Sequence, residues 1–114
     1  MNMTGGQIMG GNISIYPQST FNIFNGTIDV EGFFVEGNVN ISGGDISIDF
    51  LKGYSGCTVN IFCIDHSYDP IGNVLTGHLL DTSYFTIGIT ALGYEKLNLI
   101  PEPMSVSLFS FSLL

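Results

Sequence analysis

The sequence has 114 residues, which is enough for one domain with a modest hydrophobic core. Its 15 glycines and its abundant Ile, Val, Phe, Asn, Ser and Thr favour short β-strands joined by turns. The formal net charge is −8 and arginine is absent, which argues against nucleic acid or anionic lipid headgroups as partners. Charged residues make up only 11% of the chain and mean hydropathy is +0.39, so a disordered acidic tail is also excluded.

The first ten residues allow two interpretations. They lack the basic and apolar regions of a signal peptide, from which we expect a fragment of a longer protein or a shortened reading frame. The letters MTGGQIMG nearly match a common phage-derived epitope tag, but they also fit the register of a repeat that runs through the first half of the chain.

This repeat is an asparagine between two apolar residues, at Asn2, Asn22, Asn40 and Asn60. Three of the four copies continue into a glycine-containing turn and a second short apolar alternation. A period near 20 residues with two or three strands per period predicts an all-β fold: a parallel β-solenoid of about three coils over residues 1–65. The alternative is chance similarity within an antiparallel sandwich of short strands.

Stacking of the coils makes a definite prediction about side chains. Equivalent residues of successive coils would lie about 4.8 Å apart, so Asn22, Asn40 and Asn60 should form an outward-facing amide ladder. Their apolar neighbours should stack inward in two rows, Phe21 on Val39 on Val59 and Ile23 on Ile41 on Ile61.

Two cysteines, Cys57 and Cys63, fall in the last copy of the repeat. Along an unbroken strand they would face the same side but lie about 20 Å apart, well beyond the roughly 4.4–6.8 Å that a disulfide spans between Cα atoms. We therefore expect two small buried apolar side chains and no bridge between them.

The repeat fades after Asp65, and residues 66–100 carry turn signals and four apolar runs instead. The runs are Val74 to Leu75, Leu79 to Leu80, Phe85 to Ile89 and Leu97 to Ile100. They predict irregular or antiparallel strands that cap the open end of the stack, where a bare edge would otherwise be free to pair.

Residues 101–114 begin with Pro101, Glu102 and Pro103 and continue as the uncharged segment MSVSLFSFSLL. The triplet and the upstream segment VLTGHLLDTSYFTI resemble bacterial proteins that carry a PEP-CTERM sorting signal, and the Gly-rich repeat resembles their β-helical ectodomains. This resemblance implies that an exosortase-type membrane protease reads the triplet. It also implies a mature product at the cell surface or in the extracellular matrix.

The tail departs from the family pattern in three respects. Met104 stands where Ser or Thr usually follows, serines interrupt the apolar segment, and a terminal basic cluster is missing. Eleven helical residues would span about 16 Å against a hydrocarbon core of about 30 Å, so we expect either a truncated tail or a decayed signal, with only a transient membrane contact. The alternative is a proline-bounded loop before a final strand, since SVSLFSFS alternates cleanly.

The acids and histidines are the residues that could form a chemical site. Asp45 and Asp49 could meet Asp29 on one coil face, as in a glycosidase acid pair, but solvated corner residues are the simpler interpretation. Asp65, His66, Asp69 and the distant His78 match no known metal-ligand spacing, and His66 is expected at the surface. The sequence therefore predicts no catalytic residue, no metal site and no cofactor.

The interpretation that follows is a non-catalytic, exported surface or matrix protein of a bacterium, processed by an exosortase-type system. A surface polysaccharide is a possible partner. The first alternative is the end fragment of a carbohydrate-active β-helix enzyme. The second alternative is an adhesin or passenger-type binding module without a sorting signal.

Overall fold

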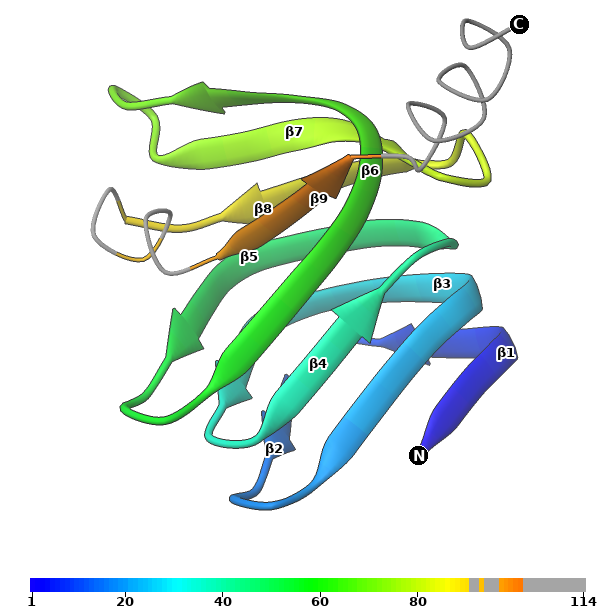
Figure 1. The fold of residues 1–114 in the computed structure, drawn as a ribbon, viewed down its shortest axis with the longest axis vertical. Coiled ribbons are helices and arrows are strands. Elements are labelled where there is room, and N and C mark those ends of the chain that lie inside the picture. Colours follow the sequence, from blue (N-terminus) through cyan, green and yellow to red (C-terminus); the bar gives the residue numbers. More distant parts are fainter. Residues whose placement is uncertain (91–92, 94–96, 102–114) are drawn as a thin grey trace, which may run out of the picture.

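The computed structural model describes residues 1–90, 93 and 97–101 and consists of β-strands (Figure 1). The strands are β1 (Asn2–Met9), β2 (Asn12–Ile15), β3 (Thr20–Val35), β4 (Asn38–Ile41), β5 (Asp45–Gly53), β6 (Thr58–Asp69), β7 (Val74–Leu79), β8 (Tyr84–Gly88) and β9 (Asn98–Pro101). Across these residues, no helix is long and apolar enough to cross a membrane.

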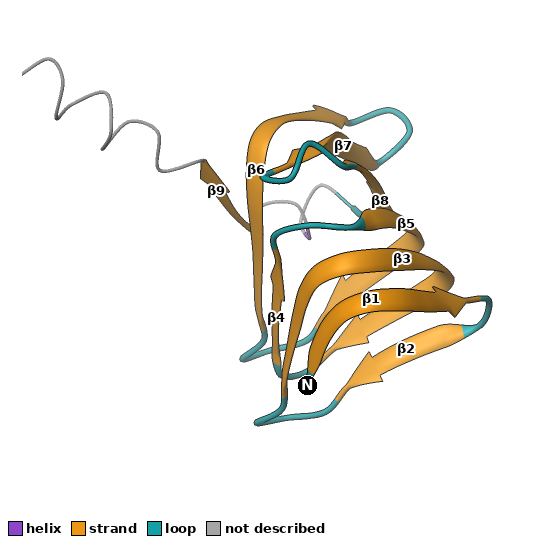
Figure 2. Ribbon diagram, turned by 90° about the vertical axis from the view of Figure 1, so that its right-hand side faces the viewer, coloured by secondary structure: helices purple, strands orange, loops and turns teal. Residues whose placement is uncertain are grey.

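Between residues 2 and 61 the chain forms a parallel β-solenoid of about three turns, which confirms the predicted fold class. The long strand β3 bends around the coil and pairs in parallel with four others. It carries β1 and β2 on one edge and β4 and β5 on the other, and β4 in turn pairs in parallel with β6 (Figure 2). The backbone N–H and C=O groups of each coil thus form hydrogen bonds with the strands of neighbouring coils.

Glycine at the coil corners makes the stacking possible. Gly26 and Gly44 both have positive φ, 109° and 100°, a region that L side chains rarely adopt. A Cβ on Gly44 would lie 2.9 Å from the carbonyl oxygen of Gly26 in the coil below. The two corners therefore stack so closely that a side chain would push the coils apart.

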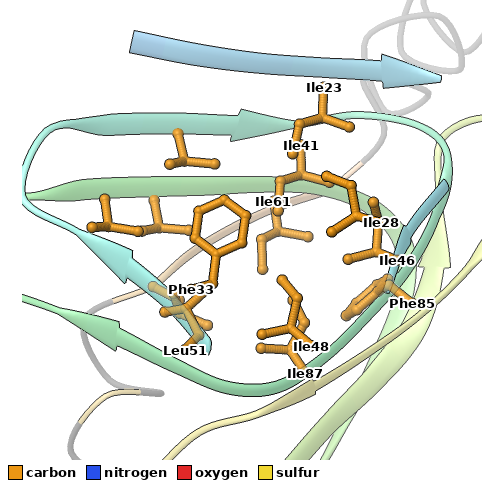
Figure 3. Close-up of a cluster of buried hydrophobic side chains, with 14 of the residues drawn as sticks. Ile23, Ile28, Phe33, Ile41, Ile46, Ile48, Leu51, Ile61, Phe85 and Ile87 are labelled. Carbon is orange, nitrogen blue, oxygen red and sulfur yellow. The ribbon is translucent and has the colours of Figure 1, made fainter. Parts of the chain in front are cut away.

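The core fills the inside of the coil with rows of like residues (Figure 3). The predicted rows are present: Phe21 pairs with Val39 and Val39 with Val59, while Ile23 pairs with Ile41 and Ile41 with Ile61. On the next wall, Ile28 aligns with Ile46 and Ile46 with Phe85. The buried side chains among the described residues are all apolar, as expected when burial of hydrocarbon drives the stack.

The capping strands pair more extensively with the solenoid strands than the sequence predicted. Only β7 is antiparallel to its neighbours, β6 and β8. β8 pairs in parallel with β5, and β9 pairs in parallel with β6, so both extend the solenoid by another partial coil. β6 crosses position 65 without a break, which means that coil and cap share one strand.

Candidate functional site

The most regular polar feature is a ladder of asparagine side chains along one outer face. The amide nitrogen of each member donates to Oδ1 of the member one coil below. The distances are 2.9 Å for Asn22 to Asn2, 2.8 Å for Asn40 to Asn22, 2.8 Å for Asn60 to Asn40 and 2.9 Å for Asn98 to Asn60. The structure thus brings Asn22, Asn40 and Asn60 together and adds a member at each end.

Asn98 is the member that sequence reasoning missed. It follows Asn60 by 38 residues because the β7–β8 excursion lies between them. A signal was available, since Leu97-Asn98-Leu99 repeats the pattern of an asparagine between two apolar residues. The parallel pairing of Asn60 with Asn98 then places the two amides at equal height.

The asparagine ladder has a structural role. An amide side chain offers one acceptor oxygen and two donor hydrogens, so a stacked row can satisfy each neighbour in turn. Asn22, Asn40 and Asn60 are half-buried and commit their amides to one another. Stacked asparagines of this kind stabilise repeated parallel strands.

The acids considered for catalysis lie on a different face. Asp29 is opposite Ser47 and Asp45 is opposite Thr27, so Asp29 does not pair directly with either of the carboxylates it was considered to meet. Asp29 and Asp45 line one shallow groove of about 210 Å³, whereas Asp49 is not part of its lining. All three carboxylates are exposed, as solvated acids would be.

The same groove contains hydroxyl groups and one exposed aromatic ring. Thr27, Ser47, Thr86 and Tyr84 complete its polar lining. The Tyr84 ring meets the His78 ring edge to face, with centroids 5.6 Å apart and an interplanar angle of 67°. This contact is of the kind that orients aromatic rings, so Tyr84 has a defined neighbour although it is 51% exposed.

His78 is also held by Asp65, across the antiparallel pairing of β6 and β7. Its Nδ1 lies 3.0 Å from Asp65 Oδ1, and its backbone N–H donates to the same oxygen at 3.0 Å. The side-chain hydrogen bond from His78 is the main influence that lowers the pKa of Asp65. The fold therefore brings together two residues that are 13 positions apart in the sequence.

His66 lies at the surface, as expected, with Nδ1 3.9 Å from the sulfur of Cys63. Both cysteines are free. Cys63 is buried, and burial together with the charge of Asp65 raises the pKa of its thiol, which keeps it protonated. Cys57 is only half-buried, contrary to expectation, because β6 begins at Thr58 and leaves Cys57 in the preceding turn.

Asp81 joins the cap to a coil corner and was not singled out from the sequence. Its Oδ2 accepts a 3.0 Å hydrogen bond from the backbone N–H of Gly44, and its Oδ1 accepts one of 2.9 Å from that of Ser83. Burial acts to raise the pKa of Asp81, but the bonds from Ser83 and Gly44 outweigh it and lower the pKa. The local Asp-x-Ser turn was readable, whereas the link to Gly44 required the fold.

Pro101 is exposed and is the last residue of β9. Glu102 and Pro103 lie outside the described residues, as do the tail and its predicted membrane contact. Within the described part of the chain, no group of three or more His, Cys, Asp or Glu side chains is placed to hold a metal ion.

The stacked coils and the amide ladder define a protein of the parallel β-solenoid class. Comparisons with protein-family models, with curated proteins and with solved structures found no match to this chain.

Proposed function

We propose that the chain is a non-catalytic structural module of an exported bacterial surface or matrix protein. The observation that carries the proposal is the continuous asparagine ladder from Asn2 to Asn98. The ladder commits half-buried polar side chains of three successive coils to mutual hydrogen bonds, as a scaffold would use them.

The sorting role rests on residues 101–103. β9 is bound to β6 by backbone pairing and by the Asn98 amide, and it ends at the exposed Pro101. Because Pro101, the first residue of the triplet, is exposed, a membrane protease could reach it without unfolding of the coils. The exosortase-type enzyme would do the chemistry, and this chain would be its substrate.

The sorting role is tested in a bacterium that encodes both this chain's gene and an exosortase-type protease. The gene is expressed in that strain and in a strain lacking the protease, and the product is followed by mass and cell fraction. We expect a shortened, surface-located product only when the protease is present. The triple variant Pro101→Ala/Glu102→Ala/Pro103→Ala should stay unprocessed.

The matched control is Pro17→Ala/Pro70→Ala, which removes two exposed prolines elsewhere and should be processed like the wild type. An identical mass and cell fraction with and without the protease would reject the sorting role. The scaffold role would survive that result. It would instead be rejected if the chain degraded a polysaccharide in a panel of neutral and acidic substrates.

A binding module is the second candidate, and the groove beside Tyr84 favours it. Sugar rings present C–H faces that stack on exposed aromatic rings and hydroxyls that bond to carboxylates. Tyr84, Asp45 and Asp29 would supply those two kinds of contact in one groove. The excess of acids in the chain favours a neutral or basic glycan over an acidic one.

This binding role is tested by titrating the protein with neutral and amino-sugar oligosaccharides. Tyr84→Ala should weaken binding by about fivefold or more, if a sugar face gains at least the lower end of the roughly 1–3 kcal/mol that a nucleobase gains by stacking on one aromatic ring. Tyr16→Ala removes another exposed tyrosine, outside the groove, and should leave binding unchanged. Equal losses in both variants would contradict a site at Tyr84.

A further inference from the structure

Asn25 and Gly26 form the only Asn-Gly pair of the sequence, and they lie at a corner of the coil within β3. The pairing of β3 with β4 ends just before them, at Ile23, and its pairing with β5 begins just after them, at Thr27. The register with β1 shifts at the same point. Where the regular pairing is interrupted, the backbone N–H of Gly26 donates to the side-chain Oδ1 of Asn25, 2.8 Å away.

Two features make this pair more reactive than the other asparagines. The 2.8 Å contact turns the side-chain carbonyl of Asn25 toward the Gly26 nitrogen, and holding two groups together lowers the entropic barrier to their reaction. Asn25 is also exposed, so water and hydroxide reach it, and glycine has no side chain to crowd the nitrogen. The amides of Asn22 and Asn40 are instead bound in the ladder. Every other asparagine of the sequence precedes Met, Ile, Val or Leu, whose side chain shields the next nitrogen.

We propose that Asn25 is a site of spontaneous covalent modification, at which the backbone nitrogen of Gly26 converts the side-chain amide into a carboxylate. The nitrogen loses its proton to hydroxide and bonds to Cγ of Asn25. The C–N bond of the side-chain amide breaks, and the NH2 group takes up a proton and leaves as ammonia. Water then opens the resulting succinimide ring, to give either aspartate or isoaspartate. The reaction consumes water, releases ammonia and needs no partner, so it does not depend on the proposed function.

The coil corner has little room for the isoaspartate product. A Cβ on Gly44, in the next coil, would lie 2.9 Å from the carbonyl oxygen of Gly26 and 3.3 Å from the carbonyl carbon of Asn25. Isoaspartate routes the main chain through its side-chain carbon, which lengthens the backbone at this tight contact. Both products also add a negative charge at the corner where the N–H of Gly44 binds the Asp81 carboxylate. Modification should therefore loosen the stacking of the coils and the attachment of the cap.

The modification is tested by incubating the full chain at neutral and mildly alkaline pH and following ammonia release and the masses of proteolytic peptides. We expect isoaspartate and aspartate in place of Asn25, and a rate that rises with hydroxide concentration because the attacking nitrogen must lose its proton. Asn25→Gln should stop the reaction, since the longer side chain would have to close a larger ring. Asn12→Gln is the matched control at another exposed asparagine, followed by Ile13, and should react like the wild type.

Two further comparisons separate the effect of the fold from that of the dipeptide. The native chain should react no more than about threefold slower than the chain unfolded in urea, because the folded corner already holds the reacting groups together. The isoaspartate form should unfold at a lower urea concentration than Asn25→Asp, which has the same charge without the longer backbone. A slower native reaction, ammonia release at the wild-type rate in Asn25→Gln, or isoaspartate spread over other asparagines would overturn the proposed site. Equal unfolding midpoints would overturn its effect on the stack.

Discussion

The side-chain amide of Asn40 donates a 2.8 Å hydrogen bond to Oδ1 of Asn22, eighteen positions earlier in the chain. The parallel pairing of β3 with β4 places both residues at the same height, so backbone and side chains pair in the same register. Because both amides are half-buried, water does not fully replace the bond when it is lost. The hydrogen bond between residues one repeat apart therefore makes the repeat period of the sequence contribute directly to the stability of the fold.

Asn40→Ala should lower the free energy of unfolding by about 1–3 kcal/mol, because Asn22 loses its donor and Asn60 loses its acceptor. Urea denaturation followed by circular dichroism measures the change. Asn2→Ala is the control at the exposed end of the ladder, where only one bond is lost and water can replace it. Equal destabilisation by both substitutions would contradict a cooperative ladder.

Gly44→Ala should be more destabilising than Gly56→Ala by about 1–2 kcal/mol. Both glycines have positive φ, 100° and 85°, so the two variants share the cost of backbone strain. Only at Gly44 would the new Cβ meet the backbone of the coil below, at 2.9 Å from the Gly26 oxygen, whereas the space beside Gly56 is open. Matching denaturation midpoints for the two variants would show that the corners are not in tight contact.

Acid should weaken the link between the cap and the coil corner at Asp81. The pKa of Asp81 is lowered in the folded state, since its bonds to Ser83 and Gly44 outweigh the effect of burial. A lowered pKa stabilises the fold above the unfolded value of about 3.9, and this contribution is lost as pH falls through the folded pKa. Stability should therefore decrease below about pH 4.

The variant Asp81→Asn should show a flatter dependence of stability on pH in this window. It should also be less stable at neutral pH, because the single side-chain oxygen of asparagine cannot accept from both the Gly44 and the Ser83 N–H groups. Asp49→Asn, at an exposed position on β5, should keep the steeper wild-type dependence. Denaturant titrations at neutral and acidic pH supply the comparison. An unchanged pH profile in Asp81→Asn would remove Asp81 as the titrating group.

The two free thiols should react at different rates with a thiol reagent. Cys57 is half-buried in a turn, whereas Cys63 is buried and the pKa of its thiol is raised, so little thiolate forms. In the native protein Cys57 should be labelled first, and both should be labelled in denaturant. Mass spectrometry of the labelled peptides decides the order. Faster labelling of Cys63 would mean that β6 opens readily.

Several side-chain contacts form only because the chain leaves the solenoid after β6 and later pairs with it again. Asn98 joins the ladder only because β7 and β8 leave the coil and β9 comes back beside β6. Asp65 meets His78 only because β6 and β7 run antiparallel. The Asp65–His78 contact has no period that a reader of the sequence could count, since hairpins join residues at variable separations. Asn98 lies 38 positions after Asn60, close to two repeat periods, but only the fold shows that the two residues pair directly.

The sequence alone determined the stacked coil, its core rows and its amide ladder over Asn22, Asn40 and Asn60. It could do so because parallel stacking places residues one period apart in direct contact, which favours the same residue type in every turn. Only the tertiary structure decided where Asp81 anchors the cap and which acids share a groove with Tyr84. Those contacts join segments with no common period, so their partners are set by the path of the folded chain through space.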